Sequence, residues 1–364
     1  MSSARTAPPR VMVAGSFAYD FYEPAFAAGL ERAGARVERF VDQRWFGPGA
    51  LLRRVQNRLA WGPGIELARV ALLVRVARVR PDVILGWRVP WLDARTMEAA
   101  RLLGARRVVT YNNDDPFGPD RALPIWRAYR ASLPSVDVAY VYRALNVEEA
   151  LGAGAPRARV LRSAYDARAH RPLPESDPRV AARACDVAFV GHHEPDGRVE
   201  AILALAAAGL DVRVSGPGWE RCAPGLRAKG VKVDGPALGD DYVASLQAAK
   251  VGLVFLSRRN RDTYTRRCFE IPAVGTAMLA PRTQDLETLF TDGVDAVFYD
   301  DVATLVSRAT DLVADASARH RIAAAGRARV ARDGHPIDAR ASQWLRDVLS
   351  VPGRAARPPA RRRA

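Results

Sequence analysis

The sequence predicts an α/β protein built from two lobes, each with a parallel sheet. Its length of 364 residues corresponds to about two domains. In the first half, short β-branched runs alternate with longer amphipathic stretches, and a second series of the same kind follows a segment rich in proline and charge. Such alternation predicts βαβ units with parallel strands. We therefore expect two Rossmann-like lobes with a ligand-binding cleft between them.

The first lobe is expected over residues 1–168. Its predicted strands are the apolar runs VMVAG (11–15), PDVILGW (81–87), RRVVTYN (106–112) and DVAYVY (137–142). The stretches between them, such as EPAFAAGLERAGARVERF (23–40), have the apolar spacing of amphipathic helices.

Residues 169–184 combine prolines and charges and are predicted to be an interdomain linker. The second lobe is expected over residues 185–336. Its predicted strands are CDVAFVG (185–191), LDVRVSG (210–216), VKVDGP (231–236), VGLVFLS (251–257), TAMLAP (276–281) and DAVFYD (295–300). A helix over 337–351 is expected to pack back on the first lobe, and residues 352–364 are predicted to be a disordered basic tail.

The charge balance favours phosphate-bearing partners. Lys and Arg number 55 against 40 Asp and Glu, which gives a net charge of +15, and a basic excess attracts nucleotides, nucleic acid or anionic lipid. The three cysteines show no metal-ligand spacing, and no run is long and apolar enough for a signal peptide or a membrane span. We expect a cytoplasmic protein.

The segment RRCFEIPAVGTAMLAP (266–281) places Glu270 in an apolar helix. A buried carboxylate is costly unless a structural arginine or a ligand pairs with it. Arg267 lies three residues earlier, on the same helical face as Glu270, and Thr265 is expected to cap the helix. With further arginines at 258, 259, 261 and 266, the region suits a diphosphate, because guanidinium groups bind phosphate oxygens in pairs. The alternative is a structural pair between Arg267 and Glu270 beneath a solvated basic loop.

Three segments carry a family resemblance: TRRCFEIPAVG (265–275), DLETLFTDGVDAVFYDD (285–301) and RHRIAAAGRARVARDGH (319–335). They resemble the CgeB-like, spore maturation type branch of group 1 glycosyltransferases, which have the GT-B fold. The resemblance implies that Glu270 binds the ribose of a nucleotide sugar, as the second acid of an E-x7-E pattern. Asp262 stands at the first position, where related retaining transferases carry Glu.

Further residues complete the expected sites. The donor-binding residues expected in the second lobe are Gly191, His193, Arg198, Asp262, Tyr264, Thr265, Arg267, Glu270, Gly275 and Thr276. We expect catalytic residues among His192, Asp114 and Asp115, because imidazole and carboxylate groups act as acids and bases. Gly15 and Ser16, after the first strand, are expected on the acceptor side. Polar turns explain the same stretches without a site, and no metal or cofactor is expected.

Residues 50–80 combine leucine, valine and tryptophan with arginines at roughly helical spacing. The commoner interpretation is a helix that packs on the core and exposes its arginines. The alternative is peripheral contact with an anionic membrane, at its inner face.

The sequence thus predicts a metal-free glycosyltransferase that uses a UDP- or GDP-linked sugar, with glycan, cell-surface polysaccharide, protein or metabolite as acceptor. Three alternatives stay open: a nucleic-acid-binding protein driven by basic charge, a GT-B nucleotide-sugar epimerase, and an inactive scaffold. The nucleic-acid alternative lacks a recognised binding module and a basic stripe with interleaved aromatics.

Overall fold

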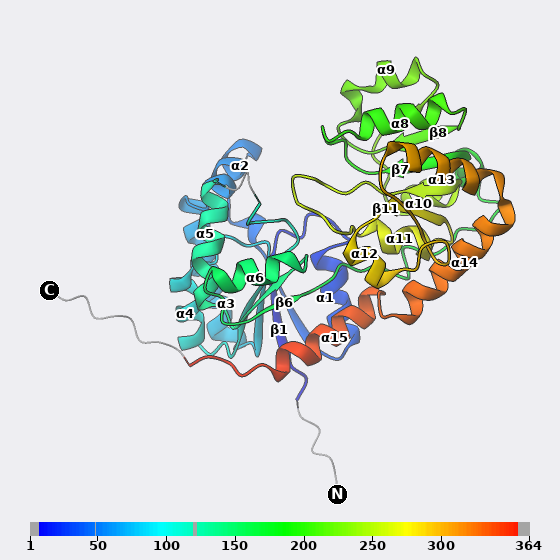
Figure 1. The fold of residues 1–364 in the computed structure, drawn as a ribbon. Helices are drawn as coiled ribbons and strands as arrows, with labels where there is room; N and C mark the ends of the chain where they lie inside the picture. The colour runs from blue at the N-terminus through cyan, green and yellow to red at the C-terminus, as the bar shows by residue number, and fades with distance from the viewer. Residues whose placement is uncertain (1–6, 48, 119–121, 356–364) are drawn as a thin grey trace, which may run out of the picture. The chain divides into compact units, whose positions relative to one another are not determined.

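The predicted apolar runs form two parallel sheets in the computed structural model, which describes residues 7–47, 49–118 and 122–355 (Figure 1). The chain divides into two compact units. Unit 1 comprises Met1–Arg162 and Ile337–Ala364, and unit 2 comprises Ser163–Pro336. Each unit has one six-stranded sheet with helices on its faces. The predicted fold class, α/β with two Rossmann-like lobes, is confirmed.

The sheet of unit 1 has the order β2-β1-β3-β4-β5-β6, with every pairing parallel. Its strands are β1 (Arg10–Gly15), β2 (Arg36–Val41), β3 (Val83–Trp87), β4 (Val108–Asn112), β5 (Val138–Val141) and β6 (Ala158–Val160). Its helices are α1 (Glu23–Arg32), η1 (Asp42–Arg44), α2 (Ala50–Leu59), α3 (Pro63–Val79), α4 (Ala94–Leu102), α5 (Pro124–Ser132), η2 (Leu133–Ser135), α6 (Leu145–Gly152) and α15 (Ile337–Ser350).

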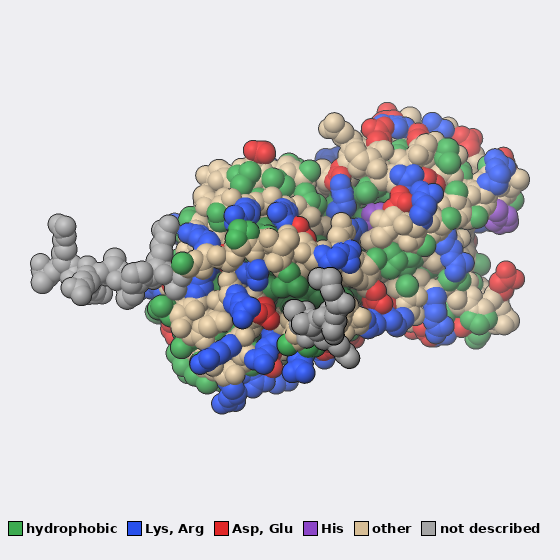
Figure 2. Space-filling model, turned by 90° about the horizontal axis from the view of Figure 1, so that it is seen from below, with side chains coloured by type: hydrophobic (Ala, Val, Ile, Leu, Met, Phe, Trp, Pro, Cys, Tyr) green, Lys and Arg blue, Asp and Glu red, His purple; other side chains and the backbone are tan. Residues whose placement is uncertain are grey.

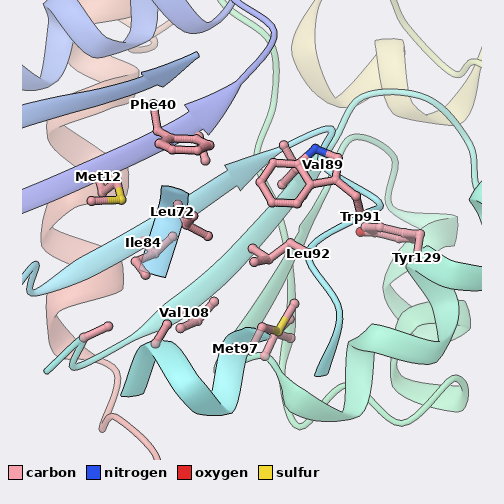
Figure 3. Packing of buried hydrophobic residues seen from close by; sticks show 14 of the residues in the cluster. Met12, Phe40, Leu72, Ile84, Val89, Trp91, Leu92, Met97, Val108 and Tyr129 are labelled. Carbon is pink, nitrogen blue, oxygen red and sulfur yellow. The ribbon is translucent and has the colours of Figure 1, made fainter. Parts of the chain in front are cut away.

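The core of unit 1 lies between the sheet and the helices on one of its faces. Figure 3 shows strand residues such as Met12, Ile84 and Val108 beside Leu72 of α3 and Met97 of α4. All five side chains are fully buried. Because the central strands are covered, they read as nearly continuous apolar runs, which is why the sequence predicts them well.

The C-terminal helix α15 packs on α1 within unit 1. Trp344 lies 5.5 Å from Phe26 between ring centroids, and a side chain at Gly29 would meet Ala341 at 3.0 Å. The chain stays attached after the helix: Val351 is buried, and the Arg354 N–H donates to Asp137 at 2.8 Å. The prediction of a disordered tail from residue 352 is therefore wrong for its first residues. Residues 356–364 lie outside the described ranges.

The sheet of unit 2 has the order β12-β11-β10-β7-β8-β9 and is also parallel throughout. Its strands are β7 (Cys185–Val190), β8 (Val212–Ser215), β9 (Lys232–Asp234), β10 (Ala249–Leu253), β11 (Ala277–Pro281) and β12 (Val297–Tyr299). Its helices are α7 (Pro178–Ala181), α8 (Arg198–Ala207), η3 (Trp219–Arg221), α9 (Ala223–Arg227), α10 (Gly239–Gln247), α11 (Arg267–Ala273), α12 (Gln284–Leu289), α13 (Val302–Ala314) and α14 (Ala316–Arg332).

Residues 169–184, expected as a linker, belong to unit 2. The His170 ring reaches Glu270, and the Leu173 backbone exchanges two hydrogen bonds with the Gln247 side chain. These partners are far away in the sequence. The local pattern of prolines and charges therefore could not predict these contacts.

Part of the basic charge is neutralised within the protein. Figure 2 shows Lys and Arg side chains spread over much of the face it draws, with Asp and Glu side chains among them. Arg282, for example, forms ion pairs with Glu287, Asp292 and Asp300. Such exposed pairs leave fewer free cations than the net charge suggests.

Candidate functional site

The strand orders locate a switch point in each sheet. In unit 2 the chain order reverses between β7 and β10, and in unit 1 it reverses between β1 and β3. In parallel α/β sheets, ligands bind outside the carboxyl ends of the strands at such points. The candidate site of unit 2 is therefore formed by the loops after β7 and β10, and that of unit 1 by the loops after β1 and β3.

Strained backbone marks three of these four loops. Phe17 follows β1, Arg88 follows β3 and Arg261 lies in the loop after β10, with φ angles of 52°, 53° and 48°. Residues other than glycine adopt positive φ at a cost, and such residues cluster at functional sites. The strain supports the same two locations as the strand orders.

Arg267 and Gly191 meet at the carboxyl end of β7. The Arg267 Nε–H donates to the Val190 carbonyl oxygen. A side chain at Gly191 would meet the Arg267 guanidinium at 2.8 Å, so glycine is needed for this approach. The Gly191 carbonyl accepts a hydrogen bond from the Trp219 indole at 2.8 Å. Arg267 is half-buried, so a partly exposed cation is held at the switch point.

The two histidines after β7 differ. His192 is exposed, and partial desolvation together with the charge of Arg267 lowers its pKa. Its imidazole is therefore neutral near pH 7 and can accept a proton. His193 is half-buried, with its ring 5.1 Å from that of Trp219 and its Nε2 3.6 Å from the Cys222 sulfur.

Arg198 is buried and paired inside its own loop. It donates to both carboxylate oxygens of Asp196, at 2.7 and 2.5 Å, and to the His192 carbonyl. Its guanidinium also lies 5.6 Å from the ring centroid of Phe189. An arginine with these partners organises the loop. A phosphate could bind Arg198, as expected, only in competition with these partners.

Glu270 is fully buried and has three protein partners. The Tyr242 hydroxyl donates to Oε2 at 2.5 Å, while Arg266 Nε and His170 Nε2 lie 2.5 and 3.2 Å from Oε1. Burial opposes the charged form, but Arg266, His170 and the Tyr242 hydrogen bond outweigh it and lower the pKa of Glu270. A ribose hydroxyl could reach this carboxylate only by displacing one of the three.

The alternative interpretation, a structural pair between Arg267 and Glu270, is wrong in its arginine, because Arg266 is the partner. Arg266 has helical backbone angles, φ −56° and ψ −34°, so its side chain stands one helical turn before Glu270, at the (i, i+4) spacing. Arg267 is turned toward Gly191 instead. Helix α11 begins at Arg267, two residues later than expected from Thr265. The start of the helix decides which of the two adjacent arginines faces Glu270.

Three expected donor residues lie in the loop after β10. Asp262 is half-buried, and its N–H donates to the Ser257 carbonyl. Tyr264 is fully buried, and its hydroxyl accepts a hydrogen bond from the Ser163 N–H at 3.0 Å. The Thr265 hydroxyl has no hydrogen-bond partner among the described residues, so the expectation that it caps α11 is wrong. Tyr264 serves to hold the chain rather than to face a ligand.

Gly275 and Thr276 lie at the opposite edge of the sheet from the other expected residues. Helix α11 runs from the carboxyl end of β10 back to the amino end of β11, and both residues precede β11. Gly275 has φ 85°, the conformation that ends a helix. The Thr276 hydroxyl is buried and donates to the Leu246 carbonyl at 3.0 Å. The structure gives both residues a role in packing, and their expected role in donor binding stays a prediction.

In unit 1, Gly15 and Ser16 are covered by Glu23. This glutamate begins α1 and is 2% exposed. Its Oε1 accepts the Ser16 N–H at 3.1 Å and the Ser16 hydroxyl at 3.3 Å. A side chain at Gly15 would meet the same Oε1 at 2.7 Å. The expected acceptor-side turn is thus organised around a buried carboxylate.

The two aspartates after β4 have separate environments. Asp114 is about one quarter exposed and pairs with Arg88 at 2.7 Å. Asp115 is fully buried, and its Oδ1 accepts from the Phe117 N–H and the Asn146 amide, both at 3.0 Å. Asp114 is partly exposed and could contact an acceptor. Asp115 is buried and stabilises the turn, a structural role that was not predicted for it.

Asp42, at the carboxyl end of β2, is buried, and its carboxylate accepts a hydrogen bond from the Trp91 indole at 2.9 Å. Burial raises the pKa of Asp42 to about 6, against the lowering effect of that hydrogen bond. Sequence reasoning missed Asp42, Glu23 and Arg88. Each directly follows a strand or begins a helix, which is the signal that could have identified them.

A cavity of about 380 Å³ in unit 2 lies beside α10, at the carboxyl ends of β8 and β9. None of the predicted site residues lines it. Two of its arginines are paired: Arg183 with Asp241 at 2.8 Å and Arg213 with Asp234 at 2.7 Å. With its charges balanced, the cavity is not suited to a diphosphate.

Residues 193–346 match the family described as glycosyl transferase-like. This part of the chain, most of unit 2 and the beginning of α15, carries a glycosyltransferase-like domain. A comparison with curated protein sequences found no significant match.

Solved structures with the same fold include two synthases and one protein in complex with UDP-glucose. The Anabaena protein HepE in complex with UDP-glucose has a TM-score of 0.66 and 13% identity, over 94% of this chain and 99% of that one. Sucrose-phosphate synthase from Thermosynechococcus elongatus has a TM-score of 0.68 and 13% identity, with coverage of 94% and 99%. For α,α-trehalose 6-phosphate synthase from Burkholderia multivorans the TM-score is 0.65 and the identity 12%, with coverage of 95% and 99%. These similarities show the GT-B fold, which has two Rossmann-like lobes.

Proposed function

We propose that this protein is a glycosyltransferase of the CgeB-like branch, which moves a sugar from a UDP- or GDP-linked donor to an acceptor hydroxyl. One observation carries the proposal: the glycosyltransferase-like match falls on the unit whose switch point holds Arg267 against Gly191. Solved structures of the same fold include one in complex with UDP-glucose. Unit 2 is the donor lobe in this proposal, and unit 1 receives the acceptor.

Arg267 is the residue we assign to the donor diphosphate. It is half-buried at the carboxyl end of β7, where a cation stabilises the negative charge that develops on the leaving group. No metal is invoked for this step. Within the described ranges, no cluster of three or more His, Cys, Asp or Glu could hold a metal ion. Adding EDTA in the thermal-shift screen tests the metal-free mechanism.

His192 is the group we assign to proton transfer from the acceptor hydroxyl. Its lowered pKa keeps the imidazole neutral near pH 7, the form that acts as a general base. Asp114 and its partner Arg88 contribute a polar contact for the acceptor in unit 1. The three free cysteines fit the reducing cytoplasm that the proposal assumes.

A thermal-shift screen with UDP, GDP, ADP, TDP and CMP, each with and without EDTA, tests the proposal. A ligand that binds only the folded state stabilises it by about 2.7 kcal/mol at a hundredfold excess over its Kd. We expect UDP or GDP to raise the melting temperature by a few degrees (about 2–4 °C), undiminished by EDTA. We also expect Arg267→Ala to abolish most of that shift.

Arg321→Ala is the matched control, because Arg321 is exposed on α14 and its loss should leave the nucleotide shift intact. Equal losses in both variants would remove Arg267 from the site. Silence across the panel, together with salt-sensitive binding to a random oligonucleotide, would favour the nucleic-acid alternative. A shift that disappears with EDTA would keep the nucleotide site and overturn the metal-free mechanism.

A further inference from the structure

Helix α2 exposes its apolar side chains and buries a polar one. Leu51, Val55 and Leu59 are 73%, 44% and 44% exposed, whereas Gln56 is 3% exposed. A helix that covers a core has the opposite arrangement. The interpretation of residues 50–80 as a core-packed helix is therefore wrong for residues 50–59, although Arg54 and Arg58 are exposed as that interpretation expected.

Gln56 fixes this orientation. Its amide nitrogen donates to the Phe46 carbonyl at 2.9 Å, and its Oε1 accepts the Gly64 N–H at 2.7 Å. A side chain at Gly62 would meet Gln56 at 2.5 Å. Rotating α2 to bury its leucines would break both hydrogen bonds, so the structure holds the apolar stripe outward.

Arginines flank the stripe on α2. Leu51, Val55 and Leu59 follow one another at four-residue spacing, and Arg54 and Arg58 form a neighbouring row at the same spacing. Within the described ranges, no ion pair involves Arg53, Arg54 or Arg58. From residue 50 to residue 65 the chain carries these three arginines and no acidic residue.

The turn after α2 and the next helix also expose apolar side chains. Trp61, in the turn between α2 and α3, is 67% exposed, and Leu67, Val70 and Val74 of α3 are more than half exposed. The opposite side of α3 packs on the core, as Leu72 does in Figure 3. We call this set the α2–α3 surface; its members are Leu51, Leu52, Val55, Leu59, Trp61, Leu67, Val70 and Val74. They are eight of the sixteen large apolar side chains that are exposed in the described part of the chain.

We propose that the α2–α3 surface docks on an anionic lipid bilayer. An exposed apolar stripe with arginines at its margin and a tryptophan beside it has the composition of a helix that lies in a membrane interface. Lipid phosphates supply the negative charge that the three arginines lack. None of the described helices is long and apolar enough to span a bilayer, so the contact is peripheral. A second copy of the chain is a poorer occupant, because it would bring two sets of unpaired arginines together.

Vesicle flotation of the full chain tests the proposal, with phosphatidylcholine vesicles and vesicles that also contain phosphatidylglycerol. We expect binding to the anionic vesicles only. Val55→Asp with Leu59→Asp should weaken it at least tenfold, by roughly the loss of two buried apolar side chains. Arg54→Gln with Arg58→Gln should weaken it by about 30-fold.

Matched controls come from the same unit. Leu102→Asp changes an apolar residue that is 61% exposed on α4, and Arg36→Gln with Arg95→Gln removes two other exposed arginines. Both controls should bind as the unmodified chain does, and circular dichroism checks that every variant is folded. A deletion of residues 356–364 distinguishes the contribution of the tail's charge to vesicle binding from that of the α2 arginines. The truncated chain should retain most of the binding.

Several outcomes would overturn the proposal. One is that the full chain does not bind anionic vesicles. Another is that test and control variants lose equal amounts of binding. A third is that deletion of the tail abolishes binding while the aspartate variant binds as the unmodified chain does. Dimers in sedimentation that the aspartate variant dissociates, without vesicle binding, would make the surface a contact between copies instead. The proposal does not depend on nucleotide binding, so its failure would leave the proposed function intact.

Discussion

Two buried carboxylates, one near the candidate site of each unit, are held in opposite ways. Glu270 in unit 2 and Asp42 in unit 1 are 0% and 4% exposed. Glu270 has a cation, Arg266, 2.5 Å away, and its pKa is lowered. Asp42 accepts from the neutral Trp91 indole, and its pKa is raised to about 6.

The difference shows that burial alone does not decide the charge of a carboxylate. Desolvation raises both pKa values, and the charge of the partners determines whether the final shift is upward or downward. Glu270 on α11 of unit 2 is therefore a fixed anion, whereas Asp42 in unit 1 changes its protonation state close to physiological pH.

The largest expected effect comes from removing the charge of Glu270. Glu270→Gln should lower the free energy of unfolding by about 3–5 kcal/mol, because it breaks the ion pair between Arg266 and the fully buried Glu270 carboxylate. Chemical denaturation at pH 7 measures this change. Glu287→Gln is the matched control, since that residue is half exposed in its pair with Arg282, and it should cost at most about 1 kcal/mol.

The opposite pattern would support the role that the family resemblance implies. If Glu270→Gln keeps the stability of the unmodified chain but loses the UDP-induced thermal shift, then the carboxylate serves the ribose. The comparison between the two carboxylates would in that case be one between a ligand-binding and a structural group.

The strands in the middle of each sheet could be predicted from the sequence, because burial on both faces makes them continuous apolar runs. The second strand could not. Strand β2 (Arg36–Val41) is an edge strand whose residues Arg36, Glu38 and Arg39 are charged, and its sequence continues the helical pattern of α1. An edge strand with charged residues avoids further pairing. Because the same residues are charged, the strand lacks the apolar alternation by which a strand is predicted from sequence.

The parts of the candidate site that depend on residues close together in the sequence could be predicted. The loops after β7 and β10 were expected, and Gly191 and Arg267 are brought together there. The partners of Glu270 were not expected, because His170 lies one hundred residues earlier and Tyr242 sits on another helix. Only the folded sheet brings such residues side by side.

A smaller effect is expected when Asp42 is made permanently neutral. In the folded protein Asp42 binds its proton more tightly than in the unfolded chain, so its contribution to stability is complete below about pH 4 and is lost as pH rises through about 6. Asp42→Asn, which keeps an acceptor for Trp91, should therefore raise the free energy of unfolding by about 2–3 kcal/mol at pH 8. At pH 4 the gain should vanish.

Denaturation curves of both proteins between pH 4 and pH 8 provide the measurement. Asp301→Asn is a suitable control, because Asp301 is an exposed helix cap with a lowered pKa, and its replacement should not be stabilising at any pH. A pH-independent difference between Asp42→Asn and the unmodified chain would show that Asp42 titrates normally, and the contrast with Glu270 would collapse.

The smallest expected effect concerns a third buried carboxylate, which makes the comparison quantitative. Asp137 in unit 1 is 0% exposed; its Oδ2 accepts from Arg101 at 2.9 Å, and its Oδ1 accepts the Arg354 N–H at 2.8 Å. Deleting residues 353–364 removes only the second of these donors. We expect it to cost about 1–2 kcal/mol, because one buried acceptor is left unsatisfied while the cation remains. Deleting residues 356–364 retains Arg354 and should cost almost nothing in the same thermal melt. If the two truncations have equal melting temperatures, then the contact of Arg354 contributes no stability, and Arg101 together with the Val108 N–H sustains the buried carboxylate without it.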